Sequence, residues 1–221
     1  MSGYTIDLTG VWSRRDMLLW GLLVTVELWV LALALGLIGG LVVGLGRLSR
    51  RKVFAWPSSC VIEIFRGTPV LLQLYVLYFG LAPFYPLHPI AAAVIGLGLN
   101  YAAYEAEIYR AGLQAVPRGQ IEAAEALGMT GPMVVRRVVL PQAFRFSLPG
   151  VANDFIALLK DSSLVSVITV VELTKRMSIA AVDSGGWLLP GLLCAALYLV
   201  MSYPLSLMAR RLERHLGPKG T

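Results

Sequence analysis

The sequence predicts an all-α integral membrane protein with five transmembrane helices in a single domain, residues 1–221. Hydrophobic residues make up 57% of the chain and charged residues only 14%, whereas soluble domains carry about a quarter charged residues. The apolar residues are concentrated in runs near the length of about 20 residues that a helix needs to cross a bilayer. Five such runs occur, at residues 17–46, 54–81, 90–109, 146–171 and 187–208.

The basic residues predict how these helices are oriented. The net charge is +6, but the Lys and Arg residues lie at the ends of apolar runs rather than on one nucleic-acid-binding face. With the N-terminus outside and the C-terminus in the cytoplasm, thirteen of them face the cytoplasm and four the outside, as the positive-inside rule requires. Arg14 and Arg15 resemble a twin-arginine export signal, but the apolar run that follows is too long for a cleaved signal. We therefore expect a retained span.

The second run contains charges and a helix-breaking sequence. Glu63 and Arg66 are three residues apart and share one helical face, where they can form an internal ion pair. After Gly67, Thr68 can cap a restarted helix with Pro69 at its first position. Such a helix start at membrane depth would attract an anionic group, for example an amino-acid carboxylate. A simple kink, or a helix start in the cytoplasm, is the alternative interpretation.

The third and fourth runs also carry polar side chains, which usually face the interior of a bundle or a water-filled path. Asn100, Tyr104 and Glu107 form one helical stripe. The fourth run holds the densest group: Asn153, Asp154, Lys160, Asp161, Ser162 and Ser163. Glu107 and Asp161 are the preferred candidates to bind a cationic amino group, while packing or ion pairing, for example of Lys160 with Asp161 or Glu105, remains the alternative.

A polar interval, residues 110–145, separates the third and fourth runs. Residues 120–127 favour a helix, and Gly128 suits a left-handed helix stop. Thr130 is a candidate N-cap for a second short helix that runs towards residue 138. The pair Leu140–Pro141 is expected to end it. Two short helices joined by a sharp break predict a stiff knob rather than a flexible linker.

The spacing within this interval resembles a known signature. The residues that carry it are Glu122, Ala123, Ala124, Gly128, Val138, Leu140 and Pro141. They fit the E-A-A…G…I-x-L-P pattern of binding-protein-dependent ABC importer permeases, with Val138 in place of isoleucine. The resemblance implies the type I ABC importer permease fold, in which this cytoplasmic loop supplies the coupling helices that dock on a separate ATPase. Glu122, Ala123, Ala124, Gly128, Leu140 and Pro141 take the coupling role by position.

Further segments are similar to the polar amino-acid branch of these permeases. They are Phe65-Arg66-Gly67-Thr68-Pro69, Gln73-Leu74-Tyr75, the run from Tyr104 to Gly112, Val116-Pro117-x-Gly119-Gln120, and the run from Leu159 to Leu164. Within them, the candidate substrate-binding or translocation residues are Arg66, Thr68, Gln73, Tyr104, Glu107, Lys160, Asp161 and Ser162.

This resemblance implies a multi-pass protein of the bacterial cytoplasmic (inner) membrane that imports polar amino acids by alternating access. The partners we expect are two ATP-binding ABC subunits, a second permease subunit in a homo- or heterodimer, an extracytoplasmic solute-binding protein, the amino-acid substrate and membrane lipid. Nucleic acid is not among them. We expect no catalytic activity, metal or cofactor in this chain, since the ATPase subunit would bind ATP and magnesium and carry out hydrolysis.

Two other functions are weighed against this one. An intramembrane enzyme would need a nucleophile near a base, but the two histidines, His88 and His215, lie outside the spans and form no Ser-His, Cys-His or metal pattern. An ion-coupled carrier or channel without an ATPase would fit the charges in the spans but would not need a docking knob. The glycine-rich stretch 36–46 lacks the lysine of a phosphate-binding G-x-x-x-x-G-K-[ST] loop, and we expect it to permit close helix packing.

Overall fold

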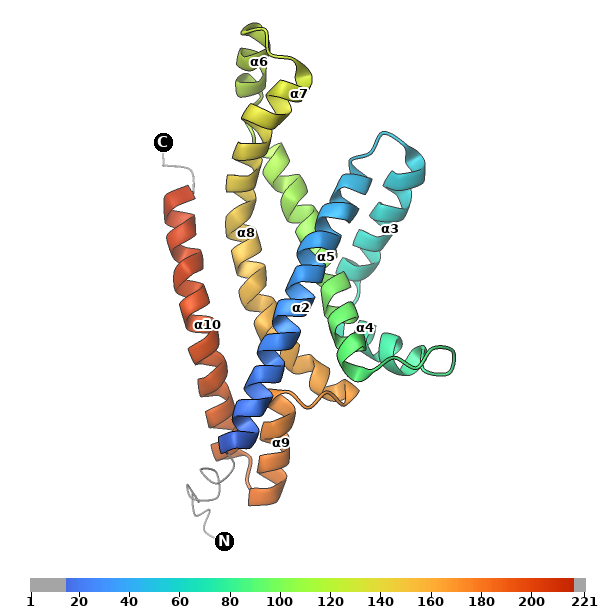
Figure 1. Ribbon diagram of the computed structural model, residues 1–221, viewed down its shortest axis with the longest axis vertical. Coiled ribbons are helices and arrows are strands. Elements are labelled where there is room, and N and C mark those ends of the chain that lie inside the picture. The colour runs from blue at the N-terminus through green and yellow to red at the C-terminus, as the bar shows by residue number, and fades with distance from the viewer. Residues whose placement is uncertain (1–14, 217–221) are drawn as a thin grey trace.

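The computed structural model describes residues 15–216, and this part of the chain folds into helices without strands (Figure 1). The helices in chain order are α2 (Arg15–Arg47), α3 (Lys52–Gly67), α4 (Val70–Tyr75), the π-helical turn η1 (Val76–Gly80), α5 (Pro89–Gln114), α6 (Arg118–Ala126), α7 (Gly131–Val134), the π-helical turn η2 (Val135–Val139), α8 (Leu140–Asp161), the 3-10 helix η3 (Ser162–Ile168), α9 (Leu173–Ser184) and α10 (Leu188–Leu216). Arg14, half of the possible export signal, lies outside the described residues. The expected all-helical fold is confirmed.

Each of the five apolar runs corresponds to a helix or a group of helices. By length and hydropathy, two described helices can cross a membrane, at residues 16–47 and 188–215, and the bent pair α3 with α4 and η1 is a third if it counts as one span. The runs at 90–109 and 146–171 fall on α5 and on α8 with η3, whose polar residues lower their mean hydropathy. Five spans in a bilayer therefore stay a prediction.

Helix α2 packs closely along α5 through its glycines. A Cβ atom at Gly36 would come within 3.2 Å of the Cβ of Tyr101, and one at Gly40 within 2.5 Å of the Cβ of Glu105. Since only hydrogen fits there, the glycine stretch allows the two backbones to approach. Its expected role in helix packing is confirmed.

The second apolar run is broken at Thr68 and Pro69, where the chain bends by 109° between α3 and α4. Both residues have extended backbone, and Pro69 rather than Thr68 is the N-cap of α4. The expected capping of α4 by Thr68 is therefore wrong. The Thr68 hydroxyl instead donates to the carbonyl of Ile64 in the preceding helix α3 (2.8 Å). After the bend, residues 70–88 (here the arm) project sideways from the bundle (Figure 1).

The interval between α5 and α8 forms the expected knob of two short helices, α6 and α7, at one end of the bundle (Figure 1). Gly128 has a φ of 80° and ends α6, and Thr130 is the N-cap of α7. Leu140 and Pro141 do not end this second helix, contrary to expectation. Instead α7 continues through η2 directly into α8, and Pro141 is the second residue of α8, directly after the π-helical turn.

At the opposite end of the bundle, α9 and the ends of α2 and α10 come together around Glu172. This fully buried residue is the N-cap of α9: its carboxylate accepts hydrogen bonds from the amides of Thr174 and Lys175, both at 2.8 Å. Tyr198 of α10 donates to the same carboxylate (3.0 Å) and Thr25 of α2 lies 3.5 Å from it. One carboxylate thus joins three helices.

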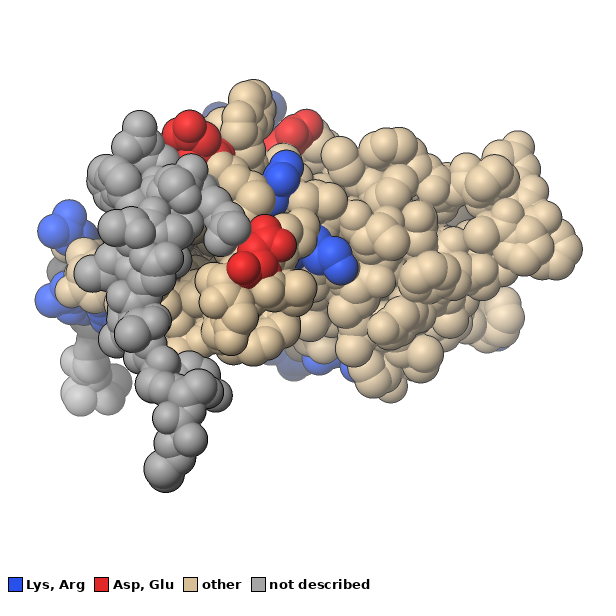
Figure 2. All heavy atoms as spheres, turned by 90° about the horizontal axis from the view of Figure 1, so that it is seen from below, with Lys and Arg blue, Asp and Glu red and all other residues tan. Residues whose placement is uncertain are grey.

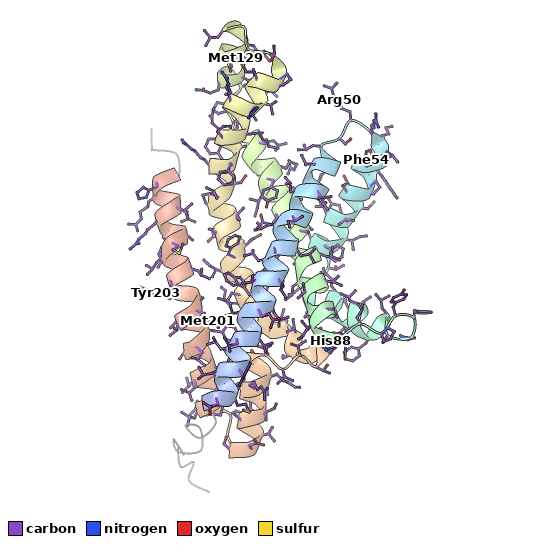
Figure 3. The ribbon with its side chains drawn as sticks, in the orientation of Figure 1. Arg50, Phe54, His88, Met129, Met201 and Tyr203 are labelled. Carbon is purple, nitrogen blue, oxygen red and sulfur yellow. The ribbon has the colours of Figure 1, made fainter. Side chains whose placement is uncertain are left out.

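The knob and the arm lie towards different ends of the molecule. Figure 3 places Arg50 and Met129 at the knob end and His88 towards the other end. Seen from the α9 end, most of the visible surface is uncharged, including the projecting arm (Figure 2). Residues 70–88 contain no Asp, Glu, Lys or Arg, so the arm is suited to an apolar environment.

Candidate functional site

Polar side chains gather where the chain bends between α3 and α4. The amide nitrogen of Gln73 donates to the carbonyl of Phe65 (2.9 Å) and to the carbonyl and hydroxyl of Thr68 (3.0 and 2.9 Å). Asn100 of α5 donates to the carbonyl of Phe65 and to the side-chain oxygen of Gln73, both at 3.0 Å. These bonds satisfy backbone groups that the break leaves without helical partners. The predicted residues Thr68 and Gln73 are thus brought together with Asn100.

A second group of charges surrounds Glu107 of α5. Its carboxylate lies 2.7 Å from Arg47 at the end of α2, 3.5 Å from Arg66 of α3 and 2.7 Å from Arg110 one turn further along α5. Glu63 lies 3.8 Å from Arg47. Three guanidinium groups and two carboxylates leave this ion cluster with one net positive charge. Since Arg47 and Arg110 already bind Glu107, an incoming ammonium group would have to displace them.

Aromatic rings connect this ion cluster with Asp161 at the C-terminal end of α8. The guanidinium of Arg66 lies over the ring of Tyr104, 5.5 Å from its centroid, which is within cation–π range. The rings of Tyr104 and Tyr101 are 6.3 Å apart, and the Tyr101 hydroxyl donates to Asp161 over 2.8 Å. Arg66, Tyr104, Glu107 and Asp161, all predicted from the sequence, therefore belong to one connected set of side chains.

The two other candidates near the end of α8 differ in their surroundings. Lys160 is exposed. Ser162 is fully buried, and its hydroxyl donates to the carbonyl of Leu159 over 2.7 Å. This bond serves the transition from α8 to η3, and the buried hydroxyl is closed to a ligand. The structure thus favours Lys160 over Ser162 as a side chain open to a ligand.

Two carboxyl groups, one on α5 and one on α8, have buried oxygen atoms. Glu105 is 1% exposed, and among the described residues neither of its carboxyl oxygens has a hydrogen-bond partner, which is also true of one oxygen of Asp154. The sequence left Glu105 as a possible ion-pair partner of Lys160, but Glu105 is buried against α2 and Lys160 is exposed. Glu105 is buried because the glycines of α2 allow that helix to pack directly over it. The glycine-rich stretch was visible in the sequence.

The knob exposes most of the residues of the predicted coupling motif. Glu122, Ala123 and Gly128 are exposed, whereas Ala124 is buried. The amide of Met129 donates to the carbonyl of Ala124 over 3.1 Å and so closes the end of α6. Beside them Leu127, an apolar side chain at the tip, is 83% exposed.

Leu140 and Pro141 are also exposed but lie at the start of α8 and not in the knob. The motif therefore covers two parts of the structure: the tip formed by α6, and the stem by which η2 and α8 connect that tip to the bundle. The stem is continuous helix from η2 into α8.

Comparison with known proteins shows that the chain belongs to a family of membrane transport components. Residues 36–218 match the family described as binding-protein-dependent transport system inner membrane component. Because this match covers most of the chain, the protein is a member of that family.

Its relatives include permease proteins of amino-acid transport systems. The chain is 35% identical over 213 residues to the arginine transport system permease protein ArtQ of Bacillus subtilis, covering 96% of this chain and 97% of ArtQ. It is 39% identical over 198 residues to the L-cystine transport system permease protein TcyB of the same organism, covering 89% and 85% of the two chains.

Solved structures agree with this assignment. A chain in the crystal structure of an amino acid ABC transporter with histidines matches with a TM-score of 0.91 and 39% identity, over 96% of this chain and 99% of that one. The MetNI methionine ABC transporter in an inward-facing form matches with a TM-score of 0.76 at 22% identity, over 92% and 98% of the two chains. The second likeness supports the fold alone.

Proposed function

We propose that the chain is the membrane-spanning permease subunit of an ATP-driven amino-acid importer and works by alternating access together with a separate ATPase. The observation that carries this proposal is the knob: a stiff, exposed pair of short helices, continuous with α8, that holds the E-A-A…G motif at its tip. Family membership and the amino-acid transport relatives support it. An ion-coupled carrier would have no use for such a docking element.

The knob end would face the cytoplasm. Arg50 and the knob lie at the same end (Figure 3), so the basic α2–α3 loop and the predicted ATPase contact fall on one side of the membrane, as the positive-inside rule requires. The arm and α9 would then face outwards, towards a solute-binding protein. The chain would cross the inner membrane five times, with α3, α4 and η1 together forming the second crossing.

The ATPase would contact the knob tip through Glu122, Ala123 and Gly128, with Ala124 packed beneath them, while Leu140 and Pro141 would lie in the stem. ATP and magnesium would bind to that partner and be hydrolysed there. A second permease subunit, either another copy or a paralogue, would complete the translocation path.

The substrate would pass the connected polar set. Its members with opposite charge, Arg66 and Asp161, suit the carboxylate and the ammonium group that every amino acid carries. Tyr104 lies between them, Thr68 and Gln73 border the set, and Lys160 is open to a ligand. Glu107 would act by holding Arg66 and the other arginines, rather than by binding the ammonium group directly. Ser162 would support the turn after Asp161.

Reconstitution tests this function. The permease is placed in liposomes with its ATPase and binding protein, and uptake of radiolabelled arginine, cystine and glutamine is measured with and without internal ATP. ATP-dependent uptake of one of them that requires all three components is expected. Equal uptake by the permease alone would instead show an ion-coupled carrier.

A further inference from the structure

An apolar groove runs between α2 and α8, with α5 as its floor, in the half of the bundle nearest the knob. Its volume is about 520 Å³, within the range of roughly 300–1,000 Å³ typical of ligand sites. Among the described residues that line it, Arg110 alone carries a charge. Leu41 and Phe144 on its walls are 53% and 65% exposed, so the groove opens sideways. None of the residues of the connected set, Arg66, Tyr104, Glu107 and Asp161, lines it.

The length of the groove matches one leaflet of a bilayer. Along α2 it extends from Leu37 to Leu48, which at 1.5 Å per residue is about 16 Å. Half of the hydrocarbon core of a bilayer is about 15 Å. At the deep end the indole nitrogen of Trp29 donates to the carbonyl of Phe155 over 2.9 Å. The groove therefore ends near the middle of the membrane, where α2 and α8 join.

The charge at the cytoplasmic end of the groove selects the headgroup. Arg110 uses its Nε and Nη2 atoms on Glu107 and its Nη1 atom on Gln114. A guanidinium has five N–H groups, so two remain for another acceptor. The ion cluster of Arg110 has one net positive charge, and Arg50, Arg51 and Lys52 lie where α2 ends and α3 begins. Basic sites of this kind at the cytoplasmic side of helix bundles bind anionic lipid headgroups.

We propose that this groove is a binding site for one anionic phospholipid of the inner leaflet. One acyl chain lies between α2 and α8, and the phosphate binds the free N–H groups of Arg110. Since Arg110 also pairs with Glu107, and Glu107 with Arg47 and Arg66, the bound headgroup contacts the same ion cluster that joins α2, α3 and α5. The lipid thereby stabilises this arrangement of the three helices.

Native mass spectrometry of the full-length chain in detergent tests the site, with phosphatidylglycerol and phosphatidylethanolamine of identical acyl chains as probes. The wild type is expected to retain one phosphatidylglycerol about tenfold more strongly than phosphatidylethanolamine. Leu41→Trp, which fills the groove, should lose this adduct. The matched control is Val42→Trp: Val42 is 65% exposed and does not line the groove, and this variant should retain the lipid.

Three results would overturn the proposal: equal retention of both lipids, an adduct that survives in Leu41→Trp, or loss of a dimer of this chain together with the adduct in that variant. The last result would show that a second copy covers the groove. If Leu41→Trp fails to fold, Leu45→Trp, on the same wall, replaces it. Arg110→Gln tests the headgroup contact and should abolish the preference for phosphatidylglycerol while weak binding of both lipids remains.

Discussion

Asn100 of α5 donates a hydrogen bond of 3.0 Å to the side-chain oxygen of Gln73, the residue four positions after the bend at Pro69. The same Gln73 side chain donates to the carbonyls of Phe65 and Thr68. One amide therefore holds the end of α3, the start of α4 and the middle of α5 together. Because the bend would otherwise leave carbonyl groups without partners in an apolar surrounding, this amide is what makes a sharp break tolerable there.

The first prediction concerns the amide of Gln73. In Gln73→Glu a carboxylate oxygen replaces the donating nitrogen and faces two carbonyl oxygens, so hydrogen bonds become repulsive contacts. We expect the free energy of unfolding to fall by about 1–3 kcal/mol, seen as a lower melting temperature of the purified protein. The exposed Gln120 of α6 supplies the control, Gln120→Glu, which should melt like the wild type. Equal melting of the two variants would refute the role of the Gln73 amide.

The second prediction concerns the charge balance around Glu107. Glu107→Gln leaves Arg47, Arg66 and Arg110 close together without the carboxylate between them. Because the Glu107 side chain is 14% exposed, solvent screens part of this repulsion, and we expect a loss of about 1–3 kcal/mol. Added salt should reduce the loss, as measured by thermal unfolding at low and high ionic strength.

A double variant separates repulsion from lost packing. In Arg47→Gln/Glu107→Gln one of the three positive charges is removed together with the carboxylate, so part of the lost stability should return. The interaction energy of the two substitutions is expected to exceed about 0.5 kcal/mol, the usual limit of additivity for separate sites. Additive effects would show that the ion pair between Arg47 and Glu107 does not contribute.

The sequence predicted those parts of the fold that local chemistry determines. The apolar runs gave the helices, Gly128 gave the end of α6, and the glycines of α2 gave its close packing against α5. Each depends on a property of the residue itself, such as hydropathy or the absence of a side chain. The helix stop at Leu140–Pro141 was wrong because a π-helical turn, whose presence depends on the neighbouring backbone, leads into α8 without a break.

The candidate site was predicted less fully, because contacts between side chains of different helices depend on how the helices pack together. Spacing placed Glu107 on the polar stripe with Tyr104, but could not show that Arg47, sixty residues earlier, would bind it. Spacing likewise grouped Ser162 with Asp161, although the change from α-helix to 3-10 helix after Asp161 turns the two side chains to different surroundings. The residue types were recognisable, and their contacts were not.

The third prediction concerns Glu172, whose carboxylate joins α9 to α10. In Glu172→Ala the amides of Thr174 and Lys175 and the Tyr198 hydroxyl lose their acceptor, and we expect a cost of about 2–4 kcal/mol from a lost N-cap and unsatisfied buried groups. Glu172→Gln retains one acceptor oxygen and should fall between alanine and the wild type. Thermal unfolding measures the order of stability of these variants. The control is Glu125→Ala on the exposed side of α6, which should melt like the wild type. Wild-type melting of Glu172→Ala would contradict this role.

The last prediction concerns Gly128 at the tip of the knob. Its φ of 80° is left-handed, and a Cβ there would meet no atom within 4 Å. The cost of Gly128→Ala is therefore one of backbone conformation alone, about 1–2 kcal/mol, and valine should cost more because its Cβ is branched. Strain of this size shifts the local equilibrium by roughly 5- to 30-fold, enough to change the shape of the tip while the helix bundle stays folded.

Gly119→Ala is the matched control, because Gly119 also has open space around it but lies in α6 without a positive φ. In proteoliposomes with the partner ATPase, Gly128→Val should lower the substrate imported per ATP hydrolysed by a factor in the same range, and Gly119→Ala should leave it unchanged. Unchanged uptake by Gly128→Val, with normal membrane insertion, would remove the knob from the coupling mechanism.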